Sequence, residues 1–171
     1  IYQATMKNTP YYAVCGNHDY HPNGCATPDV MDQENPLPGG GKMGGGNTTY
    51  YFDYGNARFV ALNSNLSITY NRANPSSSAA QVAWAYNILK NSSQPWKIVY
   101  WHHNGWSAGS HTSNSSIIDN LVTLCEDAGA NVCFWGHSHA YERFGTEKGT
   151  AFYNIGNGGK KNATSCASGT G

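Results

Sequence analysis

Short runs rich in aromatic and β-branched residues recur along the chain, each bounded by polar residues, Gly or Pro. Such runs are typical of β-strands. They occupy residues 10–14, 48–54, 58–63, 96–101, 131–135 and 150–155. Gly55-Asn56 separates the second run from the third and is a hairpin turn signal. The pattern therefore predicts a sheet that includes at least one hairpin.

Two segments between these runs have the three- and four-residue apolar spacing of an amphipathic helix. The first covers residues 79–91, with Ser78 as its expected N-cap. The second runs to Ala128 from a cap at Ser115 or Ser116, and Gly129 fits its C-cap. The expected buried faces are Val82, Ala85, Tyr86 and Leu89 in the first helix, and Ile118, Leu121, Val122 and Cys125 in the second.

Residues 23–47 show neither the strand-like runs nor the helical apolar spacing. They are dense in Gly and Pro and predict a long surface loop. Strands that alternate with helices predict an α/β domain of layered mixed β-sheets with flanking helices. The 171 residues are enough for one domain with a core.

The composition argues against two classes of partner. Ten Lys and Arg balance ten Asp and Glu, so charge gives no reason to expect nucleic acid or an anionic membrane. No apolar run approaches the ~20 residues that span a bilayer. The chain begins at Ile1 with neither Met nor a signal-peptide pattern, so we expect a mature end, a cleavage product or part of a longer protein.

Two features favour a secreted, extracellular protein. Asn-x-Ser/Thr acceptor sites are more frequent than chance predicts, although a bacterial chain could carry them unmodified. Cys15 and Cys25 bracket one loop and could form a disulfide, whereas buried free thiols are the alternative for the five cysteines. The glycosylation candidates are Asn47, Asn65, Asn91, Asn114 and Asn162.

Three of the apolar runs end abruptly in residues that can bind metal or move protons. These endings are Gly16-Asn17-His18-Asp19, His102-His103-Asn104 and Gly136-His137-Ser138-His139. The carboxyl ends of strands converge on the ligand crevice in α/β sheets, so we expect these side chains to meet. His137 and His139 can face one metal ion or two adjacent ions.

Not every histidine fits this design equally well. His103 follows His102 directly and is expected to point away from it, as a surface group or as a support behind the ligands. His21 has no comparable setting and reads as a loop residue. Taken alone, each histidine motif could also be an ordinary polar turn.

The order Gly-Asn-His-Asp, Val-x-x-His and Gly-His-x-His resembles the later motifs of the calcineurin-like metallophosphoesterases. Within that superfamily the chain is most similar to the purple acid phosphatases. The stretches "GHSHAYERF", "YYFDYGNARFVALNS" and "AFYNIGNGG" carry this likeness over essentially the whole chain.

The resemblance implies a role for each motif residue. Asn17, His102 and His137 would bind a divalent second metal ion, and His139 would bind the first, usually ferric iron. His18 and His111 would contact the phosphate and assist the leaving group. The complete enzyme would hold two metal ions, iron plus zinc, manganese or iron.

One departure from the family pattern limits this assignment. The family also needs earlier Asp-x-Gly and Gly-Asp-x-x-Tyr motifs, and the sequence has no Gly-Asp pair. We therefore expect the C-terminal portion of one metallophosphoesterase domain, with the N-terminal part in a missing segment or a second chain. Alone, it would hold one metal ion or none.

The resemblance implies a metal-dependent phosphoric ester hydrolase of the acid phosphatase type, which acts on a phosphate ester and could form a homo-oligomer. The alternative is a non-enzymatic secreted structural glycoprotein on a degenerate scaffold. A nucleotidase or a cyclic-nucleotide phosphodiesterase is a third reading, against which "HAYER" and His111 argue.

Overall fold

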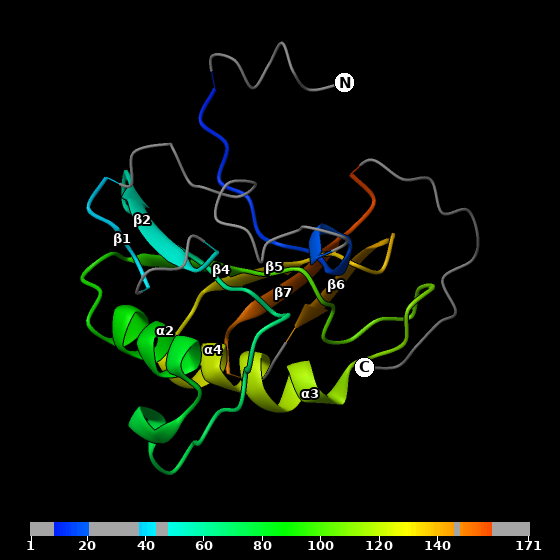
Figure 1. Ribbon diagram of the computed structural model, residues 1–171. Coiled ribbons are helices and arrows are strands. Elements are labelled where there is room, and N and C mark those ends of the chain that lie inside the picture. The colour runs from blue at the N-terminus through cyan, green and yellow to red at the C-terminus, as the bar shows by residue number, and fades with distance from the viewer. Residues whose placement is uncertain (1–8, 21–37, 44–47, 146–147, 159–171) are drawn as a thin grey trace.

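The computed structural model describes residues 9–20, 38–43, 48–145 and 148–158 (Figure 1). Within these ranges the chain forms one seven-stranded mixed sheet with helices beside it, which confirms the predicted α/β class. The sheet order is β1-β2-β3-β4-β5-β7-β6. The strands are β1 Gly41–Lys42, β2 Tyr50–Tyr54, β3 Ala57–Ala61, β4 Trp96–Tyr100, β5 Val132–Trp135, β6 Tyr141–Gly145 and β7 Ala151–Ile155.

The four central strands β3, β4, β5 and β7 are parallel, and antiparallel pairs complete both edges of the sheet. Parallel strands place their carboxyl ends at one edge. The segments that follow β4, β5 and β7 therefore emerge side by side. This topology brings two of the three histidine motifs together.

The hairpin of β2 and β3 lies where Gly55-Asn56 predicts it, and Gly55 has the positive φ of +60° that such turns require. Two strands were not predicted from the sequence. One is β6, and the other is β1, which lies inside the predicted loop over residues 23–47, so that prediction is wrong at Gly41–Lys42. Most of the remaining loop lies outside the described residues.

The helices lie on one face of the sheet (Figure 1). They are the 3-10 turn η2 Pro75–Ser77, helix α2 Ala80–Lys90, and a continuous helical segment made of α3 Ser115–Ile117, the π-helical turn η3 Ile118–Val122 and α4 Thr123–Ala128. Both helices were predicted from their apolar spacing. The C-cap at Gly129 is confirmed by its left-handed φ of +75°.

Both predicted N-caps are wrong. The N-cap of α2 is Ala79, whose side chain cannot form a capping hydrogen bond. The Ser78 hydroxyl instead accepts a hydrogen bond from the backbone N–H of Asn71. Asn114 rather than either serine caps α3, and its side chain accepts from the backbone N–H of Ile117. Several residues near each helix start could serve as caps, and the path of the preceding chain selects one of them.

The main core lies between the helices and the sheet, where Val60, Val99 and Cys133 pack among the helical side chains. The predicted helix faces are buried at Val82, Ala85, Leu89, Leu121, Val122 and Cys125, and partly buried at Tyr86 and Ile118. The opposite face of the sheet has a smaller core around Tyr50, Phe52 and Ala61.

Residues 10–14 do not form the predicted strand. They run as irregular chain over the second face, where Tyr12 and Val14 pack against the smaller core. The Tyr50 hydroxyl donates to the carbonyl oxygen of Ala13 at 2.6 Å. Apolar side chains in this run are thus buried by packing on a sheet and not by joining it.

The cysteines divide into two groups. Cys125 and Cys133 are buried free thiols. Cys15 is buried and disulfide-bonded, but Cys25 lies outside the described residues, so their pairing stays a prediction. Among the described helices, none is long and apolar enough to cross a bilayer.

Candidate metal and phosphate site

Three polar side chains meet at the carboxyl edge of the central strands. His102 lies two residues beyond β4, and His137 lies two residues beyond β5. Asn17 reaches the same place from the opening turn of the 3-10 helix η1 Asn17–Tyr20. The structure therefore brings together the three residues that the sequence analysis assigns to one metal ion.

The donor atoms of this cluster are close to one another. His102 Nε2 lies 2.8 Å from Asn17 Oδ1 and 3.2 Å from His137 Nδ1. Ligands around one tetrahedral metal ion, at bonds of about 2 Å, are separated by roughly 3.3 Å. Small adjustments of these side chains would therefore let all three bind a common ion.

Two glycines make room for the cluster. A Cβ at Gly16 would stand 2.9 Å from Cε1 and Nδ1 of His102, so the imidazole occupies the place of a side chain. A Cβ at Gly156 would collide with the backbone carbonyl of Ser138, which lies between His137 and His139. His137 itself has a φ of +64°, a left-handed conformation that is uncommon for residues other than Gly.

Burial keeps these imidazoles neutral. Burial, together with the neighbouring histidines, lowers the pKa of both His102 and His137 to about 4. His103 also has a lowered pKa because it is half-buried. The neutral imidazole is the form that binds a metal ion, so both side chains remain available as ligands under mildly acidic conditions.

The other predicted site residues surround this cluster. The ring of His111 lies 4.0 Å from that of His137 and 6.2 Å from that of His139. His18 is exposed on η1, directly after Asn17, and its charge contributes to the lowered pKa of His137. His139 lies near His111, outside the group of three donors.

Two residues of this site were underestimated or missed. His103 does not point away, because its ring lies 5.1 Å from His102 and 4.9 Å from His137, while its Nδ1 pairs with the Ser64 hydroxyl at 2.9 Å. Glu142 anchors the loop that carries His111, since it accepts from the backbone N–H of Ala108 and from the Ser107 hydroxyl. The "HAYER" stretch was the available signal for Glu142.

The donor set fits one metal ion better than two. Within the described part of the chain, no three His, Cys, Asp or Glu side chains form a metal-binding group. The cluster found here depends on the amide oxygen of Asn17 as its third donor. For a second ion, this side of the site offers His139.

The comparison with known families agrees with this geometry. Residues 1–141 match the model of the calcineurin-like phosphoesterases. The chain belongs to the calcineurin-like phosphoesterase family. This is a family of metal-dependent phosphoesterases, and it implies divalent metal ions.

Individual relatives cover less of the chain. Purple acid phosphatase 7 of Arabidopsis thaliana is 31% identical over 72 residues, which make up 42% of this chain and 22% of that protein. The chain thus spans about a fifth of the length of this curated relative. A solved structure titled "GAP50 the anchor in the inner membrane complex of Plasmodium" aligns with a TM-score of 0.49 at 17% identity, covering 69% of this chain and 39% of that one.

Proposed function

We propose that this protein hydrolyses phosphoric monoesters as an acid phosphatase, and that this chain supplies one half of a dinuclear metal site. The observation that carries the proposal is the convergence of Asn17 and His137 on His102, whose Nε2 lies within 3.2 Å of a donor atom of each, beside the ring of His111. The partial identity to a purple acid phosphatase supports the finer assignment.

Each residue has a distinct part in this proposal. Asn17, His102 and His137 hold a divalent ion, and His139 contributes to a second, with iron paired with zinc, manganese or iron. When bound, such a metal pair clamps the phosphate and supplies a nucleophilic water. His111 and His18 stand at the margin of the cluster, where they can donate hydrogen bonds to phosphate oxygens and a proton to the leaving group.

The proposal also covers partners and localisation. Carboxylate ligands for the second ion come from a further segment or from another chain. The protein is secreted and able to self-associate. Asn91 is exposed after α2 and accessible for glycosylation, whereas the Asn65 amide already donates to Cys15 and Asn63. Asn114 is engaged as a helix cap, and Asn47 and Asn162 lie outside the described residues.

The natively produced protein, supplied with zinc and iron, tests the proposal. We expect it to hydrolyse 4-nitrophenyl phosphate, and expect a chelator or His137→Ala to abolish turnover. His21→Ala serves as the matched control, because His21 belongs to none of the three motifs. A protein that binds zinc through His137 without any turnover would instead be the non-enzymatic scaffold.

A further inference from the structure

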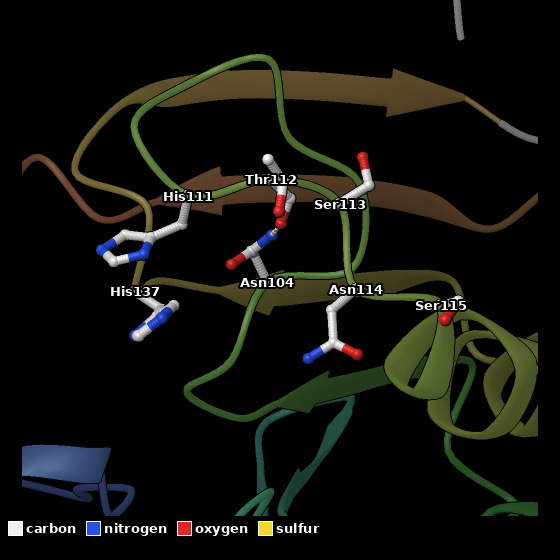
Figure 2. Close-up of a pocket in the computed structure, with 7 residues that line it drawn as sticks. All are labelled: Asn104, His111, Thr112, Ser113, Asn114, Ser115 and His137. Carbon is white, nitrogen blue, oxygen red and sulfur yellow. Dashed lines mark hydrogen bonds between the residues drawn. The ribbon is translucent and has the colours of Figure 1, made fainter.

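A polar pocket of about 330 Å³ opens beside His111 and His137. Figure 2 shows it along the loop that joins the end of β4 to α3. Its volume lies at the lower end of the range for small-molecule sites. The lining residues are Asn104, His111, Thr112, Ser113, Asn114, Ser115 and His137.

The side chain of Asn104 has a fixed orientation in this pocket. Its Nδ2 donates to the carbonyl oxygen of Thr112 at 2.9 Å and to that of Gly105 at 3.3 Å. A rotated amide would direct its own oxygen at two carbonyl oxygens, which is unfavourable. The two hydrogen bonds therefore define which end of the amide faces the pocket.

The amide oxygen of Asn104 consequently points into the pocket, toward the side where His111 and His137 lie (Figure 2). Asn104 is only 2% exposed, yet none of the described residues donates a hydrogen bond to its oxygen. The oxygen itself reaches the surface of the pocket, where water or a ligand can supply the donor that an acceptor normally has. This oxygen is thus an acceptor presented to whatever occupies the pocket.

Among the described residues, the rest of the wall is polar and carries no carboxylate, Lys or Arg. Thr112 and Ser115 are exposed, and their hydroxyls make no hydrogen bond with the described residues. Such a wall suits a neutral group with several hydroxyls, because it offers both donors and acceptors but no charge.

We propose that this pocket binds the leaving group of the phosphomonoester, and that this group is a polyol or a sugar. The inference rests on the proposed function, because the phosphate would lie at the histidine cluster beside the pocket. One hydroxyl of the leaving group donates to Asn104 Oδ1, and others interact with the Thr112 and Ser115 hydroxyls. The loop at residues 104–115 is then the determinant of substrate preference.

Three probes test the inference without disturbing the fold. Inorganic phosphate, propyl phosphate and glycerol 3-phosphate are titrated into the zinc- and iron-loaded protein by calorimetry. The two esters have the same chain length and charge but differ by two hydroxyls. One well-placed hydrogen bond changes affinity by about fivefold, so we expect glycerol 3-phosphate to bind at least about fivefold more tightly than propyl phosphate.

Two further measurements locate the effect. Thr112→Val should reduce the preference for glycerol 3-phosphate, whereas Thr69→Val, at an exposed threonine that does not line the pocket, should keep it. In NMR spectra, the side-chain amide signals of Asn104 should shift with glycerol 3-phosphate more than with propyl phosphate. Neither measurement depends on replacing Asn104, whose two hydrogen bonds hold the loop.

The outcomes separate this inference from the proposed function. Equal affinity for the two esters overturns the inference, and so does an equal loss of preference in both threonine variants. If the protein still binds phosphate in either case, the proposed function stands. If none of the three probes binds the metal-loaded protein, the proposed function fails and the inference fails with it.

Discussion

His102 and His137 differ from solvent-exposed histidines because their neutral form is favoured in the folded chain. Burial is the largest cause, and the positive charge of neighbouring imidazoles adds to it. In the unfolded chain both would titrate near the ordinary value of 6.5. Between pH 6.5 and their folded pKa of about 4, the unfolded state binds more protons than the folded state.

This difference predicts that the metal-free chain loses stability as the pH falls from 7 to 5. The stability contributed by the two neutral imidazoles is complete above pH 6.5 and decreases as pH approaches 4. Urea unfolding in the presence of a chelator, at pH 7 and pH 5, measures the change. The double variant His102→Gln/His137→Gln should show a smaller decrease over this range, and an unchanged decrease would contradict the assignment.

Gly156 predicts a second effect of a single residue. Alanine there would push against the carbonyl of Ser138 and shift His137 or His139. We expect Gly156→Ala to weaken zinc binding about tenfold and to destabilise the fold by about 1–3 kcal/mol. Gly145→Ala is the control, because a Cβ at that position meets no atom within 4 Å. Calorimetric zinc titration and thermal unfolding compare the two variants, and equal effects would refute the steric argument.

At the level of elements, Glu142 connects β6 to the loop that carries His111. Its carboxylate accepts from Ser107 Oγ at 3.0 Å and from Asn154 Nδ2 at 2.6 Å, in addition to the Ala108 backbone. A glutamine can offer only one oxygen to these donors, so the loop should loosen. The expected cost in stability is about 1–3 kcal/mol.

We expect Glu142→Gln to lower turnover of the natively produced protein while its metal content stays nearly constant. The reason is that His111 would lose its position beside His137, whereas the three donors of the metal cluster would be untouched. Elemental analysis and steady-state kinetics measure the two quantities. Glu126→Gln, which removes a surface ion pair with Lys148, is the control, and loss of metal from Glu142→Gln would show that the loop supports the ligands as well.

Five of the seven strands and both helices could be predicted because they carry a local signal, either apolar spacing or turn residues such as Gly55, whereas β1 and β6 were missed. The N-caps could not, because Asn114 and the two serines after it are all common N-cap residues. The strand predicted at residues 10–14 is wrong for another reason. Its apolar residues are buried by packing on the sheet, and burial alone does not distinguish that from strand pairing.

The site shows the same division. The ends of β4 and β5 bring His102 and His137 together, because parallel strands end at one edge of the sheet. Asn17 reaches the same place from η1 and not from the end of a strand. His103 was expected to point away from His102 because successive side chains alternate between the two faces of a strand. That rule applies only to extended chain, and β4 ends at Tyr100. The role of Glu142 depends on contacts with Ser107 and Ala108, 34 or more residues away in sequence.

At the scale of the whole molecule, the 171-residue chain offers more candidate ligands for one of the two proposed metal ions than for the other. In the proposed site, Asn17, His102 and His137 would be neutral donors for one ion, and no carboxylate within this group of three would offset its charge. His139 would be one ligand for the second ion, which needs several. A dinuclear site therefore requires carboxylates from elsewhere.

We expect the isolated chain, Ile1 to Gly171, to bind at most one zinc ion and to leave phosphate esters intact. One weakly held ion between neutral ligands cannot position and deprotonate an attacking water as a metal pair does. Calorimetry with zinc, followed by an assay with 4-nitrophenyl phosphate in zinc and iron, measures both properties. His137→Ala should abolish the zinc binding, and His21→Ala should not. Turnover that disappears with a chelator and with His137→Ala would show that the chain supplies the remaining ligands itself, and the half-site proposal would then be wrong.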